Sequence, residues 1–329
     1  MYGDKFWRVP GLPAVQRGLG VRVFFALLIT LVSVTFALVV LVGVHTNAHA
    51  ATTIYEANVP SPGSTGADPW GLAFDNNGNV LVAVPECDPT PVCNTVHIGS
   101  IVEYSRQSFS NSSIPSQVFK EPANYSSPVF LAVDGSGNIW FTEPMTNSIG
   151  ELDPTTSTWN QWAAPTANAA PFDLTFDHNG NIWFTEISAN QIGEFNPTTH
   201  KFNETPTPTS QSKPYGITGP DPTTGAIWFT ENNSSVARIG SFKPPTSSAL
   251  SQSSIKEYLT NSGSSMTTPH LITYDHSGDI WWTEGYDGDI GNLVIANASP
   301  GTHNGVTEFA VPPPGCPNPP AGCGSHISG

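Results

Sequence analysis

The sequence predicts an all-β fold, a β-propeller of four-stranded blades, with a hydrophobic helix before it at the N-terminus. The first observation is a phrase, Ile-Trp-Phe-Thr-Glu or Ile-Trp-Trp-Thr-Glu, that occurs four times, with its first tryptophan at Trp140, Trp183, Trp228 and Trp281. The second observation is the spacing, because these tryptophans are 43, 45 and 53 residues apart. Repeats of about 40–50 residues, with short strands and turn residues between them, are typical of propeller blades.

One complete repeat, residues 170–206, shows how the chain can make a blade. Residues 172–176 alternate and predict a first strand, and the Asp-His-Asn-Gly sequence at 177–180 predicts a hairpin turn in which glycine adopts positive φ. Residues 181–186 predict a second strand that is apolar on both faces, as expected for a sheet packed between two others. The third and fourth strands are expected at 191–195 and 201–204.

Five copies of the first three strands are found within residues 54–311, the expected propeller. They begin near Trp70, Val129, Phe172, Tyr215 and His270. Phrases typical of a fourth strand number six, and they begin at Ile54, Gln117, Asn160, Lys201, Ile255 and Val306. The earliest one precedes every first strand, as in a propeller whose ring is closed by a terminal strand. Two arrangements fit this count: a five-bladed ring with a Pro/Gly/Cys-rich tail at 312–329, or a larger ring whose next blade starts there.

The first fifty residues do not belong to the repeat and predict a membrane segment. Residues 1–22 carry four cations and form the expected cytoplasmic segment, while residues 23–44 are uncharged and long enough to span a bilayer as a helix. In the linker at 45–53, an Ala-His-Ala sequence ending at Ala50 matches a signal-cleavage pattern. A retained anchor and a cleaved signal peptide are both compatible, and the length of the apolar run favours the anchor. The propeller is then extracytoplasmic, either anchored to the membrane or secreted after cleavage behind Ala50.

The four cysteines form two closely spaced pairs, Cys87 with Cys93 and Cys316 with Cys323. Pairs that close short loops in an exported protein predict two disulfides. Free thiols and a metal clip are the alternatives.

The propeller sequence is acidic. Without residues 1–22, seven cations and 25 anions remain, a net charge of −18. Binding to nucleic acid requires a basic surface, so this class of partner is excluded. The charge is compatible with cation binding and also with simple solubility.

Most of the repeated motif is interpreted as scaffold. A glutamate ends every full copy of the motif, as at Glu143, Glu186 and Glu231. We expect the carboxylates of these three residues to accept backbone N–H groups in the loop that follows. The tryptophans of the motif are expected to pack one blade against the next.

The residue after the proline that opens each blade differs between copies, and only the last copy places an imidazole there, at His270. In that copy Asp275 and Asp279 flank the turn, so hairpin pairing is expected to place Glu284 opposite His270, with Cβ atoms about 4.5–5.5 Å apart. The alternative is a bulge at Gly278, which would shift this pairing by one residue. A carboxylate in that position can orient the imidazole, raise its pKa or hold a metal ion. The alternative is a surface histidine beside a structural glutamate.

The last copy, residues 269–284, has the sequence Pro-His-Leu-Ile-Thr-Tyr-Asp followed by His-Ser-Gly-Asp-Ile-Trp-Trp-Thr-Glu, and Asn/Asp-x-Ile-Gly strands recur along the chain. Over roughly residues 54–311 this pattern resembles the streptogramin B lyases (virginiamycin B lyase family). The resemblance implies a seven-bladed propeller that linearises a cyclic depsipeptide antibiotic by elimination at its ester bond, with Mg²⁺. It also implies that His270 is the acid/base and that Glu284 is a carboxylate on the Mg²⁺ side. Abstracting a proton next to a carbonyl needs such a base, together with a cation for the enolate.

Two positions of the family motif carry other residues in this chain. Thr268 stands where the family has a glutamate that is a second metal ligand, and a hydroxyl is a poor substitute for a carboxylate on Mg²⁺. Tyr215 stands where the family has a histidine that contacts substrate. Both residues are candidate substrate-binding residues.

Two functions follow as hypotheses. The first is an exported, Mg²⁺-dependent lyase that opens a cyclic ester or depsipeptide. The second is a non-catalytic extracytoplasmic propeller that binds a glycan, a peptide or a protein; a metal-dependent lactonase is a third option. The expected partners are a small-molecule or peptide ligand at the mouth of the propeller channel and a membrane through the N-terminal helix.

Overall fold

The computed structural model describes residues 59, 69–85, 98–106, 115–122, 127–260, 268–285 and 289–310. All of them belong to one compact unit, Ile54–Gly329. The hydrophobic run at 23–44, the strand phrase at Ile54, the four cysteines and the segment 312–329 lie outside the described residues, so what they predict stays a prediction. Within the described ranges, no helix has the length and hydrophobicity needed to cross a membrane.

The described residues form five antiparallel sheets of four strands, and each sheet follows chain order. Blade 1 holds β1 (Leu72–Phe74), β2 (Val80–Val84), β3 (Ser100–Tyr104) and β4 (Gln117–Lys120). Blade 2 holds β5 (Leu131–Val133), β6 (Ile139–Glu143), β7 (Ser148–Asp153) and β8 (Thr158–Ala163). Blade 3 holds β9 (Pro171–Phe176), β10 (Ile182–Glu186), β11 (Gln191–Asn196) and β12 (Lys201–Pro206).

Blade 4 holds β13 (Pro214–Thr218), β14 (Ile227–Glu231), β15 (Arg238–Phe242) and β16 (Lys256–Leu259). Blade 5 holds β17 (Thr268–Tyr274), β18 (Ile280–Gly285), β19 (Asp289–Leu293) and β20 (Val306–Ala310). Two short 3₁₀ helices, η1 (Gln252–Ser254) and η2 (Ile295–Asn297), lie before β16 and after β19. The predicted all-β fold of four-stranded propeller blades is confirmed.

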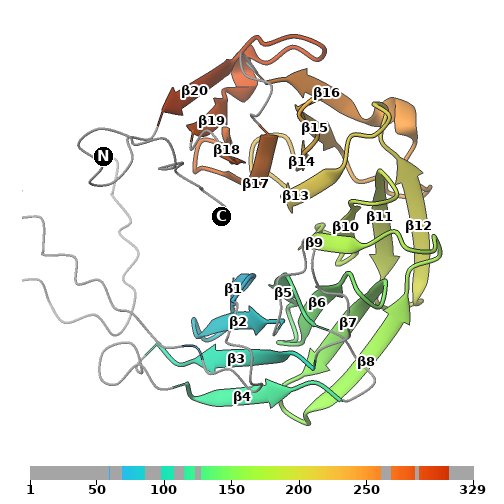
Figure 1. Ribbon diagram of the computed structural model, residues 1–329, viewed down its shortest axis with the longest axis vertical. Coiled ribbons are helices and arrows are strands. Elements are labelled where there is room, and N and C mark those ends of the chain that lie inside the picture. The colour runs from blue at the N-terminus through green and yellow to red at the C-terminus, as the bar shows by residue number, and fades with distance from the viewer. Residues whose placement is uncertain are drawn as a thin grey trace, which may run out of the picture. The chain divides into compact units, whose positions relative to one another are not determined.

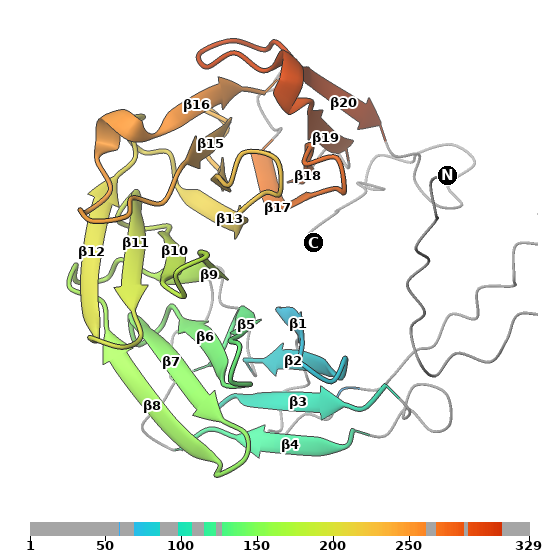
Figure 2. The same cartoon turned by 180° about the vertical axis from the view of Figure 1, so that it is seen from behind.

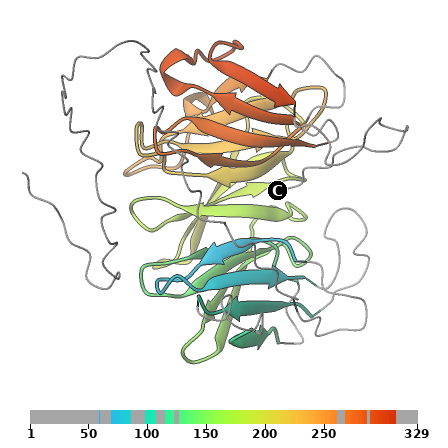
Figure 3. The same ribbon diagram turned by 90° about the vertical axis from the view of Figure 1, so that its left-hand side faces the viewer.

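The first strand of each blade lies innermost and the fourth lies outermost, as Figures 1 and 2 show from opposite sides. The innermost strands contact one another in chain order, from β1 through β5, β9 and β13 to β17. Figure 3 shows the sheets nearly edge-on, with successive blades side by side. Residues near the start of each repeat therefore meet around a common channel.

The repeated tryptophan packs one blade against the next, as predicted. Trp183 of β10 lies in one buried cluster with Ile217, Phe229 and Phe242 of blade 4. The aromatic residue that follows it has a different role: the Phe184 ring lies where a Cβ on Gly193 would be, only 2.1 Å away. The Ile-Gly pair of the third strand thus recurs because a side chain at the glycine would displace the buried ring.

The turn between the first two strands is held by its aspartate. In blade 3, Asp177 Oδ1 accepts the backbone N–H groups of Asn179 (2.8 Å) and Asn181 (3.0 Å), and its Oδ2 accepts the indole N–H of Trp183 (3.0 Å). Gly180 closes the turn at φ +81°. The aspartate therefore links the turn to the tryptophan that packs the blade.

The threonine of the motif links neighbouring blades. Thr185 Oγ1 accepts the N–H of Asp173 in its own blade (3.1 Å) and donates to the carbonyl of Tyr215 in the next blade (2.6 Å). Thr230 makes the same two bonds, to Gly216 N–H and to the carbonyl of His270. Because the hydroxyl takes the place of a ladder carbonyl, the pairing of first and second strands shifts by one residue in blades 3, 4 and 5.

The motif glutamates were expected to accept backbone N–H groups, and for Glu186 and Glu231 this is wrong. Both side chains are fully buried, and no backbone N–H of the described residues is hydrogen-bonded to their carboxyl oxygens. Each instead lies against a glutamate of the fourth strand, Glu204 for Glu186 and Glu257 for Glu231. A second carboxyl group thus fills the space in which a loop N–H was expected.

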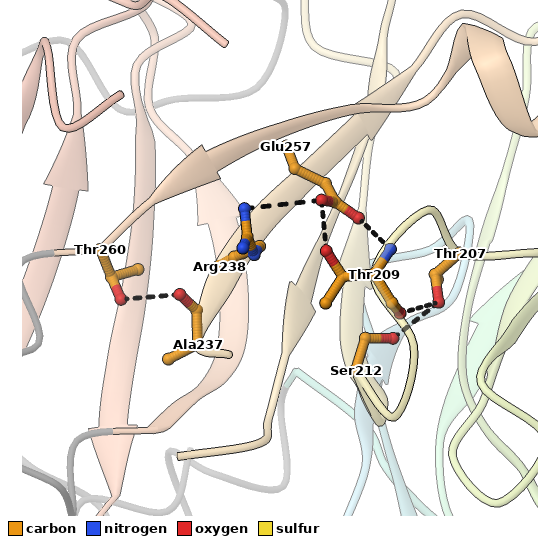
Figure 4. A network of polar contacts seen from close by, with 7 residues as sticks. All are labelled: Thr207, Thr209, Ser212, Ala237, Arg238, Glu257 and Thr260. Atoms are coloured by element: carbon orange, nitrogen blue, oxygen red, sulfur yellow. Dashed lines mark hydrogen bonds and ion pairs between the residues drawn. The ribbon is translucent and has the colours of Figure 1, made fainter. Parts of the chain in front are cut away.

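These contacts require a shared proton, because two adjacent carboxylates repel each other. Burial, reinforced by the charge of the neighbouring glutamate, raises the pKa of Glu186 to about 8 and that of Glu231 to about 9. Glu257 also accepts the N–H and hydroxyl of Thr209 (2.8 and 2.6 Å), and Arg238 Nη1 lies 3.7 Å from its carboxyl group (Figure 4).

Blade 2 contains the amide form of the same arrangement. At the position of Glu204 and Glu257 it carries Gln161, whose Nε2 donates to Glu143 Oε2 at 2.6 Å. In blade 2 an amide of the fourth strand thus donates to the motif glutamate, where a carboxyl group of the fourth strand lies against it in blades 3 and 4.

Candidate ligand site at the channel

A continuous arc of rings lies where the innermost strands begin. Trp70 contacts the rings of Phe130 (centroids 6.3 Å apart) and Phe172 (5.7 Å). Phe130 and Phe172 are 5.2 Å apart, Phe172 and Tyr215 are 4.3 Å apart, and Tyr215 and His270 are 5.1 Å apart. We call these five residues the aromatic arc. All five blades contribute to it, and blade 2 does so through Phe130, one residue beyond the expected Val129.

His270 closes the arc and is half-buried. Its Nε2 lies 3.3 Å from the hydroxyl of Thr268, and its ring is tilted by 31° against Tyr215. The imidazole also occupies the space above Gly285, where a Cβ would come within 2.4 Å of Nε2. The structure thus brings together His270, Tyr215 and Thr268, three of the residues that the sequence singled out.

Glu284 was expected opposite His270, and this pairing is wrong. The strand shift described above puts Glu284 opposite Pro269 and puts Gly285 opposite Thr268. The hydroxyl of Thr283 accepts the N–H of Leu271 (3.2 Å), which accommodates the extra residue in β17. Glu284 belongs to β18 and is fully buried, and its Oε1 accepts the indole N–H of Trp282 at 2.8 Å.

The residues around His270 do not fit a Mg²⁺ site. Mg²⁺ prefers near-octahedral oxygen coordination, usually with carboxylates and several waters. Glu284 supplies one carboxylate with no exposed surface, and Thr268 supplies only a hydroxyl that contacts His270. Across the described part of the chain, no group of three His, Cys, Asp or Glu side chains could hold a metal ion.

Next to the aromatic arc, the innermost strands surround a cavity of about 430 Å³. Its walls are Leu72 of β1, residues 130–132 before and in β5, residues 173–176 of β9, residues 217–219 in and after β13, and residues 271–272 of β17. Phe130 belongs to both the arc and the cavity wall. Cavities of this size bind small molecules in other proteins.

Asp173 is the ionisable side chain among these wall residues. It is 9% exposed, and its carboxylate accepts the N–H of Leu174 (2.8 Å) and, across to the next blade, the N–H of Ile217 (2.8 Å). Burial raises the pKa of Asp173 to about 7, against the opposing effect of the two N–H bonds. The channel therefore contains a carboxyl group that titrates near neutral pH.

Sequence reasoning missed Asp173 and Phe130. The signal for Asp173 was present: two residues after the proline that opens each blade, the five copies carry Gly71, Phe130, Asp173, Gly216 and Leu271, so a single copy has an acid. Only the fold shows that this position faces the channel.

The fold is that of a β-propeller, and its innermost strands carry the aromatic arc and line the cavity. More particularly, the chain belongs to the virginiamycin B lyase family, whose sequence profile matches residues 111–287, more than half of the 329 residues. No curated protein sequence gives a significant match.

Solved structures of streptogramin B and virginiamycin B lyases share the fold. A streptogramin B lyase structure superposes with a TM-score of 0.60 at 24% identity, over 79% of this chain and 73% of the other. Selenomethionine-substituted virginiamycin B lyase from Staphylococcus aureus gives a TM-score of 0.57 at 24% identity, over 75% and 71% of the two chains. A nidogen/laminin complex also matches, with a TM-score of 0.52 at 15% identity over 74% and 80%. At these identities the likeness shows the fold alone.

Proposed function

We propose that this protein binds a cyclic peptide or depsipeptide through the aromatic arc at the channel end. The observation that carries the proposal is the unbroken series of ring contacts from Trp70 to His270 across all five blades. Phe172 is buried beneath its neighbours, whereas Trp70, Phe130, Tyr215 and His270 keep exposed surface.

Rings held in this way suit a ligand with apolar or aromatic side chains. They are already fixed by mutual packing, so little side-chain entropy is lost when a ligand covers them. Their faces and edges offer about 0.5–1.5 kcal/mol for each ring pair beyond simple area burial. Membership of the virginiamycin B lyase family supports a depsipeptide of the streptogramin B type as the first ligand to test.

The experiment is a titration of the purified protein with a streptogramin B depsipeptide, followed by calorimetry or by tryptophan fluorescence. Tyr215→Ala is expected to weaken binding about tenfold, since it removes the ring between Phe172 and His270. Tyr274→Ala is the matched control, because Tyr274 lies in the same blade as His270 and is 37% exposed outside the arc. Equal loss in both variants, or no binding by the wild type, would overturn the proposal.

A second candidate function is ring opening by elimination, with His270 as the base. Family membership and the half-buried imidazole at the end of the arc favour it. His270 would remove the proton next to a carbonyl, the ester C–O bond would break, and the products would be a carbon–carbon double bond and a free carboxylate. Tyr215 and Thr268, which both contact the imidazole, would set its orientation.

Mass spectrometry of the product separates the possible reactions. Elimination gives a linear product of the same mass as the cyclic substrate, whereas a lactonase gives a product heavier by one water. His270→Ala is expected to abolish turnover with little change in melting temperature. An intact substrate would refute the lyase and leave the binding function standing. A Mg²⁺-dependent rise in melting temperature that disappears in Glu284→Gln would assign the cation to this site in spite of its poor donor set.

A further inference from the structure

We propose that the channel cavity binds an ammonium group, with Asp173 as its counter-ion. This inference deepens the proposed function, because the cavity and the aromatic arc share Phe130. It assigns a second recognition element to the ligand, a cationic group that enters the channel while the rest of the ligand lies on the rings.

The carboxylate of Asp173 is built into the wall. Both of its oxygens are fixed by backbone N–H groups at 2.8 Å, one from Leu174 and one from Ile217 of the neighbouring blade. Each oxygen keeps a further lone pair for a donor from the cavity. The anion is thus preorganised, and a ligand would not have to order it.

No cation of the described chain neutralises Asp173. The ion pair found among the described residues joins Arg238 to Glu257, away from the cavity. The wall residues other than Asp173 are apolar, threonine or glycine. A buried carboxylate without a counter-charge is costly, and a ligand that supplies the charge removes that cost.

The surroundings favour a cation over a neutral or anionic ligand. Phe130 offers an aromatic face on the same wall, and ring faces attract cations. The chain after residue 22 has a net charge of −18, which raises the local concentration of cations and disfavours anions.

Few other titratable groups lie on the strands packed against β9. Of these strands, β13 carries Tyr215 at its start, β10 carries Glu186 at its end and β6 carries Glu143 at its end, whereas β5 has no ionisable side chain. Glu186 lies opposite Pro171 and against Glu204, and Glu143 accepts a hydrogen bond from Gln161; neither glutamate is part of the cavity wall. Asp173 is therefore the group whose ionisation decides binding in the cavity.

The test compares two probes of nearly the same size and shape, 2-phenylethylamine and 2-phenylethanol. The first is an ammonium ion at neutral pH and the second is uncharged. By calorimetry or ligand-observed NMR at pH 8, the wild type is expected to bind the amine about tenfold more tightly than the alcohol. At pH 6 this preference is expected to fall about tenfold, because Asp173, with its pKa of about 7, is then mostly neutral.

Asp173→Asn is expected to abolish the preference for the amine, and Asp153→Asn, at the end of β7 in blade 2, is expected to keep it. Equal binding of amine and alcohol by the wild type at pH 8 would show that Asp173 is only a link between backbones, while ring recognition by the arc would stand. Absence of binding by both probes would refute the cation site, and the depsipeptide titration then decides the proposed function separately. The wild-type comparison remains decisive if Asp173→Asn does not fold.

Discussion

The buried carboxyl pair in blade 4 predicts that this protein loses stability as the pH rises. Glu231 has a pKa of about 9 in the folded protein and an ordinary value of 4.5 when unfolded. The folded state therefore binds one more proton than the unfolded state between these values. The stabilising contribution is complete below pH 4.5 and is lost as the pH rises toward 9.

The size of the effect follows from the proton difference. One proton corresponds to about 1.4 kcal/mol per pH unit, so Glu231 alone is expected to cost about 4 kcal/mol of unfolding free energy between pH 5 and pH 8. This is an upper figure, because relaxation and water entry reduce the effective penalty of a buried charge. Glu186, with its pKa of about 8, adds a similar dependence in blade 3.

Glu231→Gln removes the titration and keeps the contact. An amide can donate to Glu257 as Gln161 donates to Glu143 in blade 2, at 2.6 Å. At pH 5 the variant is expected to match the wild type to within about 1 kcal/mol. At pH 8 it is expected to be more stable than the wild type by up to about 4 kcal/mol.

The assay is urea unfolding followed by tryptophan fluorescence at pH 5, 6, 7 and 8. Glu151→Gln is the control for the loss of one negative charge, because Glu151 accepts hydrogen bonds from the amides of Asn138 and Asn160 and belongs to no carboxyl pair seen in the described residues. The reasoning is refuted if wild type and Glu231→Gln lose stability in parallel over this range.

Three further predictions concern the links between blades and the site. Thr230→Val keeps the shape of the side chain but leaves a buried N–H and a buried carbonyl without their partner, and it is expected to lower the unfolding free energy by about 2–4 kcal/mol in urea titrations. Gly285→Ala places a methyl group where the His270 imidazole lies. NMR is expected to show an altered imidazole resonance, and ligand binding is expected to fall while the melting temperature changes little. Unchanged ligand binding would contradict this placement of the imidazole. Trp183→Phe removes the hydrogen bond to Asp177 and part of the packing, and it is expected to lower the unfolding free energy by about 2–3 kcal/mol in the same assay. A decrease below about 0.5 kcal/mol would show that the turn does not depend on this hydrogen bond.

The blades could be predicted from the sequence because their signals are local. The period of the Trp-Phe-Thr-Glu motif, the Asp-x-x-Gly turns and the alternation of the first strand each fix one element, and the strands expected within the described residues were found where they were predicted. The packing role of the tryptophan could also be predicted, since an apolar side chain that recurs in every repeat must contact a neighbouring repeat.

The candidate site could be predicted only in part. His270 was found because it breaks the repeat, and its contacts with Thr268 and Tyr215 follow from the equivalence of the blades. Its pairing with Glu284 failed because a hairpin register calculated from the turn assumes an unbroken ladder. The hydroxyl of Thr283 interrupts that ladder and shifts the register by one residue.

The sequence by itself determined the all-β fold, the four-stranded blade and the singular status of His270, because these depend on residues close together in the chain. The tertiary structure decided which side chains meet between blades: the aromatic arc, the proton shared by Glu231 and Glu257, and the cavity that exposes Asp173. Each of these depends on how far one strand is shifted against the next and on the space left by residues of another blade. A one-residue shift changes every such contact while leaving the repeat pattern intact.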